Sequence, residues 1–200
     1  MSIDLGVLFV TFGVIALAEL PDKSLIATLI LATRSRALWV WLGASAAFVT
    51  HVVIAVTVGR ALSLLPQEVV DGIAAGLFAL GAAVMWFGSP FDETDETEIE
   101  AAAVRTLPPG ATGVIARSFA IVFVGEWGDV TQITTANLAA RYDDPLSVGI
   151  GSALALISVA AVGVTAGRLV LRLAPVDTIR RIAAVVLLVL AGLSLAAALR

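Results

Sequence analysis

The sequence predicts an all-α integral membrane protein in which six transmembrane helices form two inverted-topology three-helix repeats. Composition is the first observation behind this fold class. Sixty per cent of the residues are hydrophobic, 14% are charged and the mean hydropathy is +1.02, and long apolar runs of this kind are typical of membrane spans. The second observation is an acidic pattern that occurs twice in apolar surroundings, with its two copies 107 residues apart.

Each copy of the pattern consists of an acid, two residues, a second acid, one residue and a hydroxyl. The first copy begins residues 19–25 and the second begins residues 126–132. Proline or glycine precedes the second acid in each copy, and both residues weaken a helix. The equivalent pairs are Glu19 and Glu126, Asp22 and Asp129, and Ser24 and Thr131.

The first and fourth predicted helices are broken at these motifs. Residues 5–20 and 26–33 are apolar, but neither run reaches the roughly 20 residues that a span needs. We therefore expect one crossing broken near Pro21, and a matching crossing from residues 113–125 and 133–140. A break of this kind is tolerated in lipid only where the freed backbone faces protein or a polar cavity.

The remaining spans are uninterrupted apolar runs. Six acids between Asp92 and Glu100, followed by Pro108, Pro109 and Gly110, indicate a solvated linker. The predicted units are a first repeat (residues 1–88), an acidic linker (89–112) and a second repeat (113–200). The four uninterrupted spans are residues 37–58, 69–88, 146–165 and 182–199.

Three spans per half place the two repeats in opposite orientations, which is the inverted-repeat plan of many secondary transporters. The first, third and fifth loops hold eight arginines and the other side holds three, so we expect a cytoplasmic linker with both termini outside. No cationic region precedes the first apolar run, so we expect that run to be retained as a span. With no organellar transit signal, a bacterial cell membrane is the expected location.

Four acids carry the functional hypothesis. Of the sixteen acids, these four were assigned to the interior of predicted spans, where each costs roughly 2.5–3.5 kcal/mol at a helix centre. A spacing of three residues places the two acids of each pair on one helical face. If the repeats pack together, the cluster takes up either protons or a cation, and exchange between the two is the proposed mechanism. The four are Glu19, Asp22, Glu126 and Asp129.

Oxygen ligands near these acids favour a hard divalent cation such as Ca²⁺, Mn²⁺ or Mg²⁺. There is no cysteine, so thiolate sites and disulfides are excluded. Lys23 is expected to act as a tethered counter-ion or to reach an interface, and His51 and Asn137 are expected to line the path or to form hydrogen bonds between helices. The candidate oxygen ligands besides the carboxylates are Ser24, Thr28, Thr131, Gln132 and Thr135.

The doubled motif resembles that of the transmembrane protein 165 family of cation/proton exchangers, in which Glu-x-Gly-Asp-(Lys/Arg)-(Thr/Ser) occurs once in each three-span half. Residues 126–129 match its acidic core, and Lys23 matches its basic position. Because that family is associated with Ca²⁺ and Mn²⁺ transport, the resemblance implies exchange of Mn²⁺ and/or Ca²⁺ for protons, with metal export from the cytoplasm. It also implies that the four acids are ligands and that Ser24 and Thr131 are the hydroxyls of the motif.

Two positions depart from this pattern. Pro21 replaces the first glycine, which stiffens the break, and Val130 replaces the second basic residue. The site is therefore more acidic than the family pattern, which leaves ion preference and stoichiometry open.

A passive divalent-cation channel and an exporter of another small solute with the same repeat plan are the alternative functions. An enzyme is not expected, because the spans lack a constellation of catalytic residues, and the net charge of −4 does not favour nucleic acid. The expected partners are the lipid bilayer and divalent cations, without a permanent cofactor. The choice between Mn²⁺ and Ca²⁺, the choice between H⁺ and Na⁺, and homodimerisation stay open.

Overall fold

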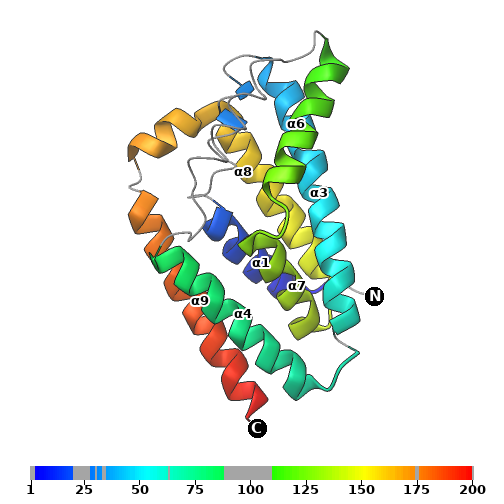
Figure 1. The fold of residues 1–200 in the computed structure, drawn as a ribbon, viewed down its shortest axis with the longest axis vertical. Coiled ribbons are helices and arrows are strands. Elements are labelled where there is room, and N and C mark those ends of the chain that lie inside the picture. The colour runs from blue at the N-terminus through cyan, green and yellow to red at the C-terminus, as the bar shows by residue number, and fades with distance from the viewer. Residues whose placement is uncertain are drawn as a thin grey trace.

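The computed structural model describes residues 3–19, 28–29, 31–32, 35–62, 64–87, 110–173 and 176–199. Within these ranges the regular structure is entirely helical (Figure 1). The described helices are α1 (Leu5–Glu19), α3 (Ala37–Leu62), α4 (Gln67–Phe87), α6 (Ala111–Gly125), α7 (Val130–Tyr142), α8 (Pro145–Leu173) and α9 (Val176–Ala198).

Four of the described helices, α3, α4, α8 and α9, are long enough and apolar enough to cross a membrane. Between 33% and 44% of each apolar window is buried inside the protein, which leaves a broad apolar surface for lipid. The helices α1 and α6 are also apolar but have only 15 residues each. These helices indicate a multi-pass membrane protein.

The observed helices extend somewhat beyond the apolar runs that predicted them. The helix α8 continues to Leu173, whereas the predicted span ends at residue 165. Hydropathy marks only the part of a helix that suits lipid, and backbone hydrogen bonds continue past it. The four predicted uninterrupted spans, residues 37–58, 69–88, 146–165 and 182–199, correspond to α3, α4, α8 and α9.

The break predicted at the second acidic motif is present. The helix α6 ends at Gly125, a turn follows, and α7 begins at Val130. Gly128 in this turn has a φ of +78°, a left-handed conformation that suits glycine. Asp129 has extended backbone and caps α7 by accepting a hydrogen bond from the Thr131 N–H. The break predicted near Pro21 lies outside the described residues.

Two glycines allow close helix crossings at equivalent places in the two halves of the chain. A Cβ atom on Gly151 of α8 would lie 2.6 Å from the backbone oxygen of Leu8 in α1. A Cβ atom on Gly43 of α3 would collide with the backbone oxygen of Ile115 in α6. Both members of this pair recur 107 to 108 residues later in the chain, so α1 against α8 and α3 against α6 are corresponding contacts.

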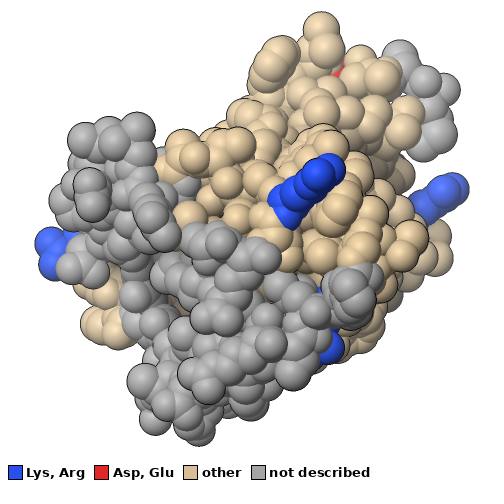
Figure 2. Space-filling model, turned by 90° about the horizontal axis from the view of Figure 1, so that it is seen from above, with Lys and Arg blue, Asp and Glu red and all other residues tan. Residues whose placement is uncertain are grey.

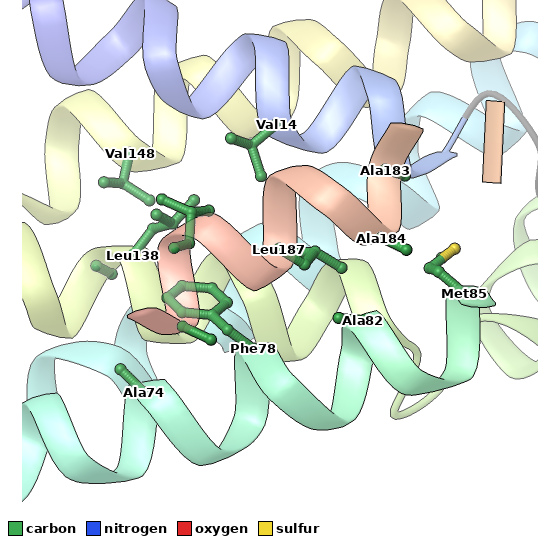
Figure 3. Close-up of a cluster of buried hydrophobic side chains, with 13 residues drawn as sticks. Val14, Ala74, Phe78, Ala82, Met85, Leu138, Val148, Ala183, Ala184 and Leu187 are labelled. Carbon is green, nitrogen blue, oxygen red and sulfur yellow. The ribbon is translucent and has the colours of Figure 1, made fainter. Parts of the chain in front are cut away.

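The largest described apolar core joins α4 and α9 to α1, α7 and α8. Phe78 of α4, Leu138 of α7 and Leu187 of α9 are each at most 1% exposed. Figure 3 shows their side chains gathered in the space that these helices enclose, with Val14 of α1 and Val148 of α8 nearby. This core fixes α7, the helix that follows the acidic turn, against three neighbours.

A buried ion pair fastens the other end of α7, and it corrects the count of membrane acids. Arg141 donates a hydrogen bond to Asp71 of α4 at 3.0 Å and another to the Ser194 hydroxyl of α9 at 2.6 Å. Asp71 is only 6% exposed. It lies within the predicted span 69–88, so the assignment of only four acids to span interiors was wrong. Its position near the start of the span made it resemble an interfacial residue.

Figure 2 looks onto the end of the molecule at which α3 and α6 begin. Basic side chains project from this face and its rim, and very little acidic surface is visible among the described residues. Arg36 immediately precedes α3 and lies 5.1 Å from the centre of the Trp39 ring, and Arg117 follows the first turn of α6. Arginines therefore border the described part of this end.

Candidate metal centre

Three carboxylates from separate parts of the chain converge at the break between α6 and α7. Glu19 is the last described residue of α1, Glu126 immediately follows α6, and Asp129 immediately precedes α7. One oxygen from each lies within 4.8 Å of the other two. Glu19 and Glu126 are 0% and 4% exposed, whereas Asp129 is half-buried. This geometry is compatible with one cation bound between them.

The turn, rather than a helical face, brings Glu126 and Asp129 together. We expected the spacing of three residues to place both acids on one side of a helix, but the helix ends before Glu126. The left-handed conformation of Gly128 reverses the chain direction within the motif and returns Asp129 to the cluster. The expected proximity is thus obtained by a different backbone path.

Helix α6 contributes its electrostatic field to this site. Its C-terminal end lies next to Glu126, and the last carbonyl groups of a helix carry a partial negative charge. The N-terminus of α7 would repel a cation, but the Asp129 carboxylate accepts from the Thr131 N–H at 3.4 Å and from its hydroxyl at 3.2 Å. A broken helix with its C-terminal end at the site therefore favours a cation.

A small cavity borders the carboxylates. Its volume is about 10 Å³, which is room for about one water-sized sphere. Of the predicted hydroxyl ligands, Thr131 and Thr135 face it, and the Thr135 hydroxyl lies 3.2 Å from the Ser152 hydroxyl of α8. The lining residues are Phe48, His51, Val52, Ala55, Glu126, Thr131, Gln132, Thr135 and Leu156.

The predicted residues Gln132 and His51 contact each other at the edge of this cavity. The Gln132 Nε2 atom lies 3.1 Å from the His51 Nδ1 atom, and the Gln132 Oε1 atom accepts from the Gly128 N–H at 2.8 Å. The His51 Nε2 atom lies 3.0 Å from the backbone oxygen of Phe123 in α6. Both side chains thus contact the two sides of the helix break.

The other predicted residues divide into two groups. Thr28 and Asn137 are buried, at 1% and 2% exposed, and Asn137 lies on α7 two turns beyond Asp129. Ser152 was not among the predicted residues, because a single serine in an apolar run gives no signal of its partner. Asp22, Lys23 and Ser24 lie outside the described residues.

Comparison with known proteins gives one family match that covers most of the chain. The sequence matches the family described as "Divalent cation/proton antiporter GDT1" over residues 7–93 and again over residues 114–200. The second match begins 107 residues after the first, which equals the spacing of the two acidic motifs.

Individual relatives show the same similarity. A GDT1-like protein of Synechocystis is 30% identical over 166 residues, which cover 78% of this chain and 80% of that protein. The chloroplast protein PAM71 of Arabidopsis thaliana is 31% identical over 164 residues, 70% of this chain and 43% of its own length. GDT1-like protein 1 of Oryza sativa subsp. japonica chloroplasts is 30% identical, with 70% and 47% covered.

The chain therefore spans most of the Synechocystis protein but less than half the length of these two plant proteins. No solved structure matches the chain.

Proposed function

The chain belongs to the GDT1 family of divalent cation/proton antiporters, and from this premise we propose that it exchanges Mn²⁺ or Ca²⁺ for protons across a membrane. Family membership agrees with the resemblance drawn from the two acidic motifs. The family consists of transporters and not of enzymes, so the carboxylates are assigned to ion binding.

The observation that carries the proposal is the convergence of Glu19, Glu126 and Asp129 within 4.8 Å at a helix break. Three negative charges at this separation repel one another strongly in a mostly buried site. Bound protons or a bound cation relieve this repulsion, and both compete for the same oxygens. Competition at one site is the chemical basis of exchange. Carboxylate and hydroxyl oxygens suit Mn²⁺ and Ca²⁺.

The proposed architecture is the pair of inverted repeats, residues 1–88 and 113–200, joined by the linker 89–112. The corresponding crossings at Gly43 and Gly151 and the double family match support it. Three spans per repeat give opposite orientations, so motion of one repeat against the other exposes the site to each side in turn. The second pair of an acid and a hydroxyl, Asp22 and Ser24, completes the proposed site.

The direction of transport follows from the proposed topology. Eight of the eleven arginines border the loops on the linker side, which places that side in the cytoplasm, with both termini outside. Metal export from the cytoplasm in exchange for entering protons is the proposed direction.

The proposal is tested with purified protein in vesicles that contain a trapped pH dye. Addition of Mn²⁺ or Ca²⁺ outside is expected to move protons in the opposite direction, and Asp129→Asn and Glu126→Gln are expected to abolish this movement. The matched control is Glu68→Gln, which removes an exposed acid at the start of α4. Metal entry without proton movement would instead indicate a channel or a Na⁺-coupled carrier. Absence of any metal movement would refute the transport proposal.

A further inference from the structure

His51 contacts both sides of the helix break. This side chain lies on α3, is 4% exposed, and is the single histidine of the chain. Its Nε2 atom is 3.0 Å from the Phe123 oxygen, in the last turn of α6. Its Nδ1 atom is 3.1 Å from Gln132, and Gln132 in turn binds the Gly128 N–H. The series Phe123, His51, Gln132 and Gly128 is called the brace below.

The direction of every hydrogen bond in the brace is fixed by its ends. A backbone oxygen only accepts, so the His51 Nε2 atom carries the hydrogen that is donated to Phe123. A backbone N–H only donates, so the Gln132 oxygen faces Gly128 and its amide nitrogen donates to His51 Nδ1. One neutral tautomer of His51 and one orientation of the Gln132 amide therefore satisfy all three contacts.

The brace occupies groups that the helix break leaves without helical partners. In an unbroken helix the Trp127 N–H would bind the Phe123 oxygen, but here it binds the Val124 oxygen at 3.3 Å. His51 supplies the hydrogen for Phe123 and also stacks on the Phe123 ring, with centroids 4.8 Å apart. The end of α6 is thus held against α3.

On the other side of the break, the brace holds the glycine turn. A Cβ atom placed on Gly128 would meet no atom within 4 Å, so packing from the described residues does little to restrain this position. The bond from the Gly128 N–H to Gln132 is 2.8 Å long and links the turn to the first turn of α7. Because Asp129 directly follows Gly128, the position of its carboxylate depends on this restraint.

We propose that His51 and Gln132 are positioning residues, which set the separation of the Glu126 and Asp129 carboxylates by bracing the turn between them. This inference rests on the proposed function and assigns Gln132 a role other than the ligand role expected from sequence. The brace belongs to the second motif alone, because the equivalent positions are Leu25 and Val159, whose side chains form no hydrogen bonds.

The transport test uses Gln132→Leu, which keeps the approximate size of the side chain and removes both amide hydrogen bonds. Loss of a partner that orients a metal ligand typically costs 10–100-fold in metal affinity. We expect the KM for Mn²⁺ to rise about tenfold or more, while the rate at saturating Mn²⁺ changes little. Thr50→Val is the matched control on α3, since the Thr50 hydroxyl bonds only to its own helix at Ala46, and it should leave the KM unchanged.

A double variant separates the brace from two unrelated packing effects. His51→Phe preserves a ring for the stack on Phe123 but removes both nitrogens. Because either substitution breaks the same brace, Gln132→Leu combined with His51→Phe should raise the KM no further than the larger single effect. Multiplicative effects of the two substitutions on KM, or an unchanged KM in Gln132→Leu, would overturn the proposal.

A spectroscopic measurement tests the brace independently of transport. Protein labelled with ¹⁵N-histidine gives ring signals from His51 alone. The expected spectrum shows hydrogen on Nε2, and Gln132→Leu should shift the Nδ1 signal while Nε2 remains protonated. Hydrogen on Nδ1, or an identical Nδ1 signal in Gln132→Leu, would refute the brace. If wild-type vesicles move no metal but the spectra agree, the proposed function fails and the brace stands.

Discussion

Replacing Gly151 by alanine should push α8 away from α1. The added Cβ atom would lie 2.6 Å from the Leu8 oxygen and 3.1 Å from the Thr11 Cβ atom. The closer neighbour is backbone, so one helix has to shift, and overpacking of this kind costs about 1–3 kcal/mol. Gly192→Ala on α9 is the matched control, because a Cβ atom there meets nothing within 4 Å of the described residues. Both substitutions gain the same helix propensity, so their difference isolates the crossing.

The assay is thermal unfolding of the purified variants in one detergent. A loss of 1–3 kcal/mol corresponds to a melting temperature roughly 2–12 °C below that of Gly192→Ala. Gly43→Ala should show a similar loss, since its Cβ atom would meet Ile115 and Ser118 at the corresponding crossing. If Gly151→Ala and Gly43→Ala melt with the control, the close crossings are wrong. A loss at only one of them would argue against equivalent halves.

Three further substitutions test other parts of the structure. Arg141→Met leaves Asp71 buried without its ion-pair partner and should destabilise the protein by about 3 kcal/mol in denaturant unfolding, with much of the loss recovered by adding Asp71→Leu. The Ser147 hydroxyl and backbone N–H hold the pKa of Asp144 below its ordinary value of 3.8. Its stabilising contribution is therefore complete above that pH and is lost as the pH falls through the lower folded pKa, so Asp144→Ala should melt earlier at pH 7 and match wild type in strong acid. Gly128→Ala places a Cβ atom at φ +78°, which costs roughly 1–2 kcal/mol, and should weaken Mn²⁺ transport more than it lowers the melting temperature.

Hydropathy was sufficient to predict the long helices, because a lipid-crossing helix needs an apolar run of nearly fixed length. The break between α6 and α7 was also predictable, since Gly128 lies between two acids in an apolar run and each of these features disfavours an ordinary buried helix. The convergence of Glu126 and Asp129 could be expected from their spacing. The turn that produces it could not, because the spacing is equally compatible with a continuous helix.

Contacts between distant helices were not predictable from the sequence. The Gln132–His51 hydrogen bond joins residues 81 positions apart, and it depends on how α3 packs against α7. The Asp71–Arg141 pair likewise depends on the approach of α4 to α7. Composition and periodicity show which face of a helix is polar, but they do not show which polar residue of another helix will face it.

The most direct test of the central claim is a titration of the purified, detergent-solubilised protein with Mn²⁺ in weak buffer, with released protons recorded at several pH values. If protons and metal compete for the cluster formed by Glu19, Glu126 and Asp129, Mn²⁺ binding should release protons and its affinity should rise with pH. Asp129→Asn and Glu126→Gln should weaken the binding and reduce the proton release, whereas Glu68→Gln should match wild type. Binding of Mn²⁺ without proton release, with the same affinity in Asp129→Asn, would contradict the account.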